Sequence, residues 1–218
     1  MKEFLINLDK KILVIAPHPD DESIGCGALL SRYGEQCDVI VLTDGCYGNP
    51  EWTNNRTSRV RKKEAQAAMA SVGVSSTKFL NIQDNALHKY SNCLYEIDLS
   101  IYDYIFVTGK EDGHSDHKAA YRALICALEH QKIRKMVCQY EVWTPLIDFT
   151  HYLNFDPSDK EDIIKYYECQ LKHVDYLKMT RGLGMYRASQ LHMEGEKLAE
   201  VYIFEESGYE RKWFNLFG

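Results

Sequence analysis

The chain has 218 residues, of which 45% are hydrophobic and 27% charged, and these proportions are typical of one globular α/β domain. Its formal net charge of −6 argues against nucleic acid as a partner, because phosphate binding needs a cluster of basic side chains. The apolar runs are too short to span a bilayer, which argues against stable membrane insertion.

Apolar runs and helical patterns alternate along the chain, and this alternation predicts a mostly parallel sheet covered by helices on both faces. In chain order, the apolar runs predict strands near 11–16, 37–43, 78–82, 102–108, 136–142 and 198–205. The patterns between them predict helices near 23–34, 57–73, 115–131 and 159–178. We therefore expect an α/β fold, a Rossmann-like three-layer sandwich built as a single domain over residues 1–218.

Two local features complete this prediction. Thr57 or Ser58 is expected to cap the second helix, because hydroxyl side chains can accept hydrogen bonds from the first backbone N–H groups. The segment 143–158 has no clear periodicity and is interpreted as a long ordered loop, a type of segment that is often functional. Residues 11–145 form the expected core of the domain, and residues 146–218 form a lid and a closing strand.

Chemically reactive side chains follow two of the predicted strands. The first strand ends in His-Pro-Asp-Asp over residues 18–21, and the fourth is followed by Gly-His-Ser-Asp-His over residues 113–117. Histidine and carboxylate groups beside a buried strand are costly to desolvate unless they are paired or bind a metal. Ligands of such folds bind beyond the carboxyl ends of the strands, so we expect the two clusters to meet there.

The residue types in these clusters are those of a zinc site. Neutral imidazole and carboxylate are natural zinc ligands, and a catalytic zinc keeps three protein ligands and one water. The spacing of His114 and His117 places both rings on one side of the first turn of a helix. The two clusters together therefore indicate one metal-dependent hydrolytic site.

Two longer stretches around these clusters, APHPDDESIGCGALL and GHSDHKAAYRAL, resemble the PIG-L/LmbE-like zinc-dependent N-deacetylases. Thr43-Asp44-Gly45, Arg61-x-x-Glu64-Ala65 and Asp84 are similar to further landmarks of that family. The resemblance is good over residues 11–145 and thinner beyond them. It implies a protein that removes acetyl groups from N-acetylglucosaminyl compounds.

The resemblance also implies a role for individual residues. Three residues are implied as zinc ligands: His18, Asp21 and His117. Asp20 is implied as the general base, and His114 as the group that stabilises the transition state. Three residues are implied at substrate-binding positions: Arg61, Asp44 and Asp84.

These roles agree with the chemistry of amide hydrolysis. Zinc lowers the pKa of a bound water to about 7 and polarises a carbonyl group. Asp20 can take a proton from the water and return it to the departing amine. His114, when protonated, can donate a hydrogen bond to the oxyanion of the tetrahedral intermediate. Other divalent first-row metals, such as iron or cobalt, also fit this set of ligands.

Simpler interpretations exist for the residues outside the two clusters. Asp44 and Asp84 have the chemistry of turn residues, and Arg61 could lie on a solvated helix face beside Glu64. Three aromatic residues are candidates for sugar-stacking walls, although aromatic side chains more often belong to the core: Trp143, Tyr152 and Tyr186. His192 lies in a stretch that could fold over the site. The remaining histidines are expected at the surface: His88, His130, His151 and His173.

The expected function is hydrolysis of the acetamide of an N-acetylated amino sugar or its conjugate. One alternative is an amidase acting on a non-sugar or larger amide. Another is a zinc-bound sensor or binding module without turnover. A dinucleotide site after the first strand is rejected, because Leu30 replaces the third glycine of the fingerprint and acidic side chains would repel a pyrophosphate.

The cysteine content bears on the compartment. Seven cysteines without paired spacing are typical of reduced thiols in a cytoplasm. The N-terminus lacks the apolar core and the cleavage site of a signal peptide. We therefore expect a cytoplasmic protein whose partner is a small N-acetylated sugar or glycoconjugate. The family resemblance makes a homo-oligomer plausible.

Overall fold

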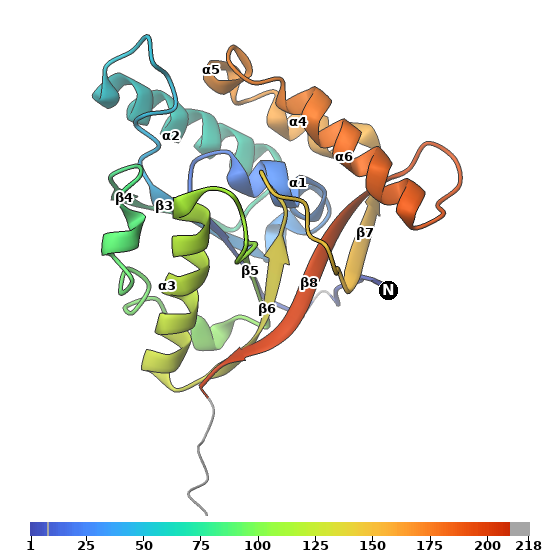
Figure 1. Ribbon diagram of the computed structural model, residues 1–218, viewed down its shortest axis with the longest axis horizontal. Helices are drawn as coiled ribbons and strands as arrows, with labels where there is room; N and C mark the ends of the chain where they lie inside the picture. Colours follow the sequence, from blue (N-terminus) through green and yellow to red (C-terminus); the bar gives the residue numbers. More distant parts are fainter. Residues whose placement is uncertain (8, 210–218) are drawn as a thin grey trace, which may run out of the picture.

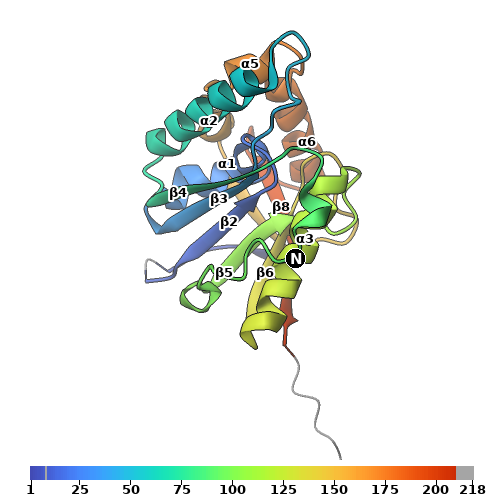
Figure 2. The ribbon, with the colours of Figure 1, turned by 90° about the vertical axis from the view of Figure 1, so that its left-hand side faces the viewer.

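The structure, a computed structural model, describes residues 1–7 and 9–209. Within these residues, the strands form one 8-stranded sheet in the order β1-β7-β8-β6-β5-β2-β3-β4 (Figures 1 and 2). The strands are β1 (Lys2–Glu3), β2 (Ile12–Ala16), β3 (Cys37–Thr43), β4 (Ser76–Ile82), β5 (Tyr104–Thr108), β6 (Arg134–Tyr140), β7 (His151–Phe155) and β8 (Leu198–Gly208).

The sheet is parallel from β4 to β6, where β2 lies between β3 and β5. The strand β8 is antiparallel to both β6 and β7, and β1 extends the edge parallel to β7. Every residue of β2 is buried, as expected for a central strand covered on both faces. The expectation of a mostly parallel α/β sheet is confirmed.

Six α-helices are described: α1 (Asp21–Tyr33), α2 (Asn54–Ser71), α3 (Ser115–Gln131), α4 (Pro157–Ile164), α5 (Glu168–Leu171) and α6 (Tyr176–Gln190). Three short 3₁₀ segments accompany them: Gly34–Gln36, Leu87–Lys89 and Leu99–Ile101. No helix of the described part of the chain is long and apolar enough to cross a membrane.

The helices form one layer on each side of the sheet. Because side chains alternate along a strand, Ile12 and Val14 of β2 pack in one core with α1 and α2, whereas Leu13 and Ile15 pack in a second core against α3. Residues of α4 and the segment that follows it also belong to the first core, beside α1. Figure 1 shows α3 on one side of the sheet and α1, α2, α4 and α6 on the other.

The strands and the first three helices lie close to the predicted ranges, but two predictions in the C-terminal third were wrong. The expected helix 159–178 is divided into α4, α5 and the beginning of α6. Asp175 starts α6 as a new helix, because its side chain accepts a hydrogen bond from Lys178 N. The expected loop 143–158 contains β7, which forms because β1 and β8 supply its hydrogen-bond partners on either side.

The predicted cap of the second helix was also wrong. The helix α2 begins at Asn54 with Thr53 as its N-cap, and Thr57 lies inside the first turns. The hydroxyl of Thr57 donates to Thr53 O at 3.2 Å instead of capping the helix. The capping residue therefore lies one turn earlier than the hydroxyl pattern indicated.

Buried contacts of Glu200 tie the C-terminal strand to both α1 and α4. The helix α1 bends at Cys26, where φ is −128°. Glu200 of β8 accepts hydrogen bonds from Ala28 N at 2.9 Å and Leu29 N at 3.3 Å, just beyond the bend. Lys160 of α4 pairs with the same carboxylate at 2.8 Å. The closing strand thus satisfies backbone groups that the bend frees from the helix.

Candidate active site

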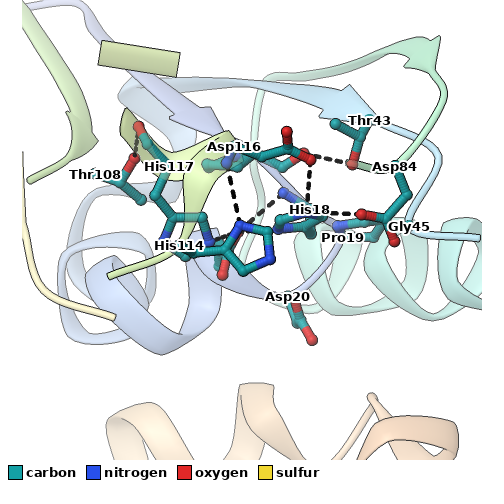
Figure 3. A network of polar contacts seen from close by, with 12 residues as sticks. His18, Pro19, Asp20, Thr43, Gly45, Asp84, Thr108, His114, Asp116 and His117 are labelled. Atoms are coloured by element: carbon teal, nitrogen blue, oxygen red, sulfur yellow. Dashed lines mark hydrogen bonds and ion pairs between the residues drawn. The ribbon is translucent and has the colours of Figure 1, made fainter. Parts of the chain in front are cut away.

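The two reactive clusters meet at the carboxyl end of the sheet, as the positions of their strands predicted (Figure 3). Residues 18–21 follow β2, and residues 114–117 follow β5 and begin α3. Two threonines hold the loops in place: Thr43 at the end of β3 donates to Pro17 O at 2.8 Å, and Thr108 at the end of β5 donates to His117 O at 3.0 Å. The parallel sheet therefore brings together side chains that are far apart in the sequence.

Asp21 is the point where the clusters converge. Its Oδ2 lies 3.0 Å from His18 Nδ1 and 3.1 Å from His117 Nε2. Burial alone would raise the pKa of Asp21, but His117 and His18 hold it well below its usual range. A carboxylate oxygen and two imidazole nitrogens thus face one another in a buried space, which is the donor set of a catalytic zinc site.

Carboxylates occupy the outer sides of both histidine rings. His18 Nε2 lies 3.2 Å from Asp84 Oδ1 and 3.3 Å from Asp116 Oδ2, and His117 Nδ1 lies 3.2 Å from Asp112 Oδ1. Burial opposes protonation of His117, but Asp21 and Asp112 overcome this effect and raise its pKa to about 9. Outer carboxylates of this kind orient metal-binding histidines.

The geometry of His117 supports a cation at this point. Both Nε2 and Nδ1 are buried and have no aligned hydrogen bond to any of the described residues, although Asp21 Oδ2 lies 3.1 Å from Nε2 and Asp112 Oδ1 lies 3.2 Å from Nδ1. Such a nitrogen is costly unless a ligand occupies its lone pair. Ring nitrogens of His18, His114 and His117 also lie within 4.8 Å of one another. The residues present therefore fit a divalent metal ion.

A second set of candidate ligands consists of His18, Asp84 and Asp116. The carboxylates of Asp84 and Asp116 already accept backbone hydrogen bonds. Tyr47 N donates to Asp84 Oδ2 at 3.1 Å, and Asn85 N donates to Asp116 Oδ2 at 2.8 Å. We therefore assign them to the support of His18 and not to the metal.

Asp20 stands apart from this network, as Figure 3 shows. Its Oδ1 lies 2.9 Å from Arg61 Nη2, and its Oδ2 is buried without a hydrogen-bond partner in the described part of the chain. Burial raises the pKa of Asp20 to about 6, against the opposing effect of Arg61. A carboxylate with one oxygen held and one oxygen unpaired is suited to accept a proton.

His114 lies at the N-cap of α3, and its Nδ1 accepts a hydrogen bond from Asp116 N at 3.2 Å. A ring that accepts at Nδ1 carries its proton on Nε2. Burial, together with His18 and His117, lowers the pKa of His114. The ring can therefore donate from Nε2 while neutral, so this donation does not require the protonated ring that the sequence analysis considered.

The three residues expected at substrate-binding positions have different surroundings. Arg61 is buried, and it donates from Nη1 to Gly45 O at 3.0 Å and from Nη2 to Pro19 O at 3.1 Å. Asp44 holds a turn, because its Oδ1 accepts from Cys46 N at 3.1 Å and from Asp84 N at 3.0 Å. Asp84 supports His18, as described above.

A cavity of about 230 Å³ opens over these residues. Its lining consists of His18, Asp20, Asp21, Tyr47, Gly48, Arg61, Asp84, Asn85, His114, Trp143, Gln170 and Tyr176. A larger cavity of about 530 Å³ lies between α6 and the turn that follows it, but its lining contains neither cluster. The chemistry of the lining therefore makes the smaller cavity the candidate active site.

Of the three aromatic residues that the sequence offered as candidates for sugar stacking, only Trp143 lines this cavity. Tyr152 lies in β7, and Tyr186 is exposed on α6. His192 is exposed on the turn after α6 and is not part of the lining. All seven cysteines are free thiols, as their spacing indicated.

Several residues around the site were not found by sequence reasoning. Asp112 supports the loop that carries the cavity wall, because its Oδ2 accepts from Trp143 N and Thr144 N, both at 3.2 Å. Glu22 is fully buried, and this burial raises its pKa to about 8. A search for carboxylates next to the ligand histidines would have identified Asp112 and Asp116. No such signal marks Gln170 or Tyr176, which come from the C-terminal third.

Comparisons with known proteins indicate one family. The model of the PIG-L family, described as GlcNAc-PI de-N-acetylase, matches residues 13–128. An uncharacterised deacetylase of Escherichia coli K12, YaiS, is 31% identical over 137 residues, which are 56% of this chain and 69% of that protein. A 1D-myo-inositol 2-acetamido-2-deoxy-alpha-D-glucopyranoside deacetylase of a Nocardioides species is 34% identical over 87 residues, 34% of this chain and 29% of that protein.

Among solved structures, the N,N'-diacetylchitobiose deacetylase from Pyrococcus horikoshii has the same fold. The TM-score is 0.70 at 18% sequence identity, and the match covers 90% of this chain and 84% of that one. The sequence match to the Nocardioides protein spans less than a third of that protein's length.

Proposed function

Because the chain belongs to the PIG-L family, whose model matches residues 13–128, we propose that it is a metal-dependent deacetylase that hydrolyses the acetamide of an N-acetylglucosaminyl conjugate. One observation carries this proposal. Asp20, whose buried Oδ2 has no hydrogen-bond partner among the described residues, lines the same cavity as Asp21, on which His18 and His117 converge. A proton acceptor beside a metal-binding set is the arrangement that amide hydrolysis requires.

His18, Asp21 and His117 would hold the metal, and we propose zinc. When bound there, zinc lowers the pKa of a water molecule and polarises the acetyl carbonyl. Asp84 and Asp116 orient the ring of His18, and Asp112 orients the ring of His117.

Asp20 carries the proton in this mechanism. Its Oδ2 accepts a proton from the attacking water and returns it to the amine nitrogen as the C–N bond breaks. The ion pair with Arg61 holds Oδ1, so the free oxygen keeps a defined position. His114 donates from Nε2 to the acetyl oxygen as negative charge develops there.

The lining of the cavity supports an amino sugar as the substrate. Trp143 and Tyr176 lie with ring centroids 6.2 Å apart, and such aromatic faces pack against sugar rings. Gln170 is buried in the lining and adds an amide group that can bond a hydroxyl. We propose that Arg61 and Asp84 border the sugar within the cavity, and that Asp44 acts indirectly by holding the backbone of Asp84.

The experiment is a measurement of acetate release by the zinc-loaded protein. The substrates are free N-acetylglucosamine, its conjugates with inositol and with malate, and an N-acetylated amino acid as the non-sugar amide. We expect release from at least one sugar substrate, loss of activity on chelation and recovery with zinc. Release from the amino acid alone would favour a general amidase, and no release from any of them would favour a binding module.

A further inference from the structure

The peptide group that joins Pro19 to Asp20 is held at both of its polar ends. Arg61 Nη2 donates to Pro19 O at 3.1 Å, and Asp20 N donates to Glu22 Oε2 at 3.2 Å. Asp20 itself has φ 149° and ψ −26°. A positive φ is strained for a residue that carries a Cβ. The two hydrogen bonds hold the peptide group in its orientation and thereby maintain this φ.

This backbone conformation frees the side chain of Asp20. An aspartate at an N-cap ordinarily turns its carboxylate onto the first N–H groups of the helix. Asp20 is the N-cap of α1, yet its side chain makes no capping bond. Its backbone carbonyl accepts from Ser23 N at 3.0 Å and from Ile24 N at 2.9 Å. The carboxylate is therefore available to Arg61 and to the cavity.

Glu22 is itself held by the C-terminal third of the chain. Tyr167, which lies between α4 and α5, donates its hydroxyl to Glu22 Oε1, and the same hydroxyl lies 2.8 Å from Ser23 Oγ. Both Glu22 and Tyr167 are almost completely inaccessible to solvent. Neither residue belongs to the lining of the active-site cavity. Their contacts are those of a support and not of a group that touches substrate.

We propose that Glu22 is a positioning residue, whose carboxyl oxygen, held by Tyr167, locks Asp20 in the conformation that presents its free oxygen to the reaction. This inference rests on the proposed function, because it assumes that Asp20 is the general base. The role requires an acceptor oxygen on residue 22 and does not require a negative charge there.

The first test compares Glu22→Met with Glu22→Gln. Methionine has a similar length but lacks the acceptor oxygen, whereas glutamine keeps it. We expect Glu22→Met, corrected for metal content and folded fraction, to lower kcat by about 10- to 100-fold with little change in KM, because misplacement of a catalytic group has effects of this size. Glu22→Gln should recover most of that loss. A crystal structure of Glu22→Met should place φ of residue 20 in the negative range.

The second test uses two matched tyrosines. Tyr167→Phe removes a buried hydroxyl from Glu22, and Tyr202→Phe removes one from Glu200, to which Tyr202 donates at 2.6 Å. Both changes leave a buried glutamate with one hydrogen-bond partner fewer, but only one of the two glutamates, Glu22, contacts Asp20. We expect Tyr167→Phe to lower kcat several-fold and Tyr202→Phe to lower only the melting temperature.

Three results would overturn the inference: a wild-type kcat in metal-loaded Glu22→Met, equal losses in Glu22→Met and Glu22→Gln, or equal losses of kcat in the two tyrosine variants. Asp20→Asn separates this failure from failure of the proposed function. If Asp20→Asn is inactive while Glu22→Met is fully active, only the positioning role is lost. If Asp20→Asn is fully active, the proposed role of Asp20 is itself wrong.

Discussion

Arg61 of α2 and Asp20 at the start of α1 form a buried ion pair, in which Nη2 and Oδ1 are 2.9 Å apart. This contact occupies one oxygen of the carboxylate and leaves Oδ2 unpaired among the described residues. The neighbouring Asp21 has other partners, since its Oδ2 contacts His18 and His117. Two adjacent aspartates thus have different partners, which agrees with the different roles proposed for them.

Asp20→Asn should keep the metal and lose most of the rate. The amide has a similar shape but cannot accept the proton of water, and general-base catalysis contributes about 10²- to 10⁴-fold. The measurement is kcat together with metal content by elemental analysis. Loss of the metal to the same extent as in a ligand variant would contradict the division of roles between Asp20 and Asp21.

His117→Ala should lose the metal, and Asp112→Asn should weaken metal binding by about 10- to 100-fold, because a carboxylate behind a ligand histidine supports it by this amount. Asp112 Oδ1 lies 3.2 Å from His117 Nδ1. Competition with a chelator of known affinity measures both effects. The matched control is Asp98→Asn, since Asp98 is an exposed carboxylate that bonds Ser100 and has no contact with the site. Equal metal affinity in Asp112→Asn and the control would contradict the prediction.

The strain at Asp20 predicts an order of stability between two inactive variants. Asp20→Gly and Asp20→Ala both remove the carboxylate, but only glycine accepts φ 149° without steric cost. Strain of this kind costs about 1–3 kcal/mol. The free energy of unfolding of Asp20→Gly should therefore exceed that of Asp20→Ala by roughly this amount. Denaturant titration measures the difference. Equal stabilities would indicate that the backbone is relaxed in solution.

The ion pair between Lys160 and Glu200 should contribute strongly to stability. Lys160→Met leaves the carboxylate of Glu200 buried without its cation, and removing one member of a buried pair costs about 3–5 kcal/mol. The lower end of this range is expected, because Glu200 keeps its hydrogen bonds to α1. The control is Lys165→Met, which breaks an exposed pair with Asp162 and should leave the unfolding curve unchanged. A similar effect of both substitutions would contradict the prediction.

The sequence alone was sufficient for the central strands of the sheet and for the expectation that the two reactive clusters meet at its carboxyl end. Strands such as β2 and β3 are continuous apolar runs, which are recognisable because both faces of a central parallel strand are buried. His18 and Asp21 follow β2, His117 lies in the first turn of α3 after β5, and parallel topology brings these strand ends to one edge. Residue type and position in the chain therefore indicated both the donor set and its convergence.

The tertiary structure alone decided how these residues are held. The φ of Asp20, the orientation of Glu22 by Tyr167 and the support of His117 by Asp112 all depend on contacts between side chains and backbone groups brought together by folding. The strand β7 and the break between α4 and α6 have the same origin, because their hydrogen-bond partners lie on other segments. Local patterns report the burial of each residue and its intrinsic preferences. They carry no information on which remote group satisfies a buried donor or acceptor, and the geometry of the Asp20 carboxylate depends on such groups.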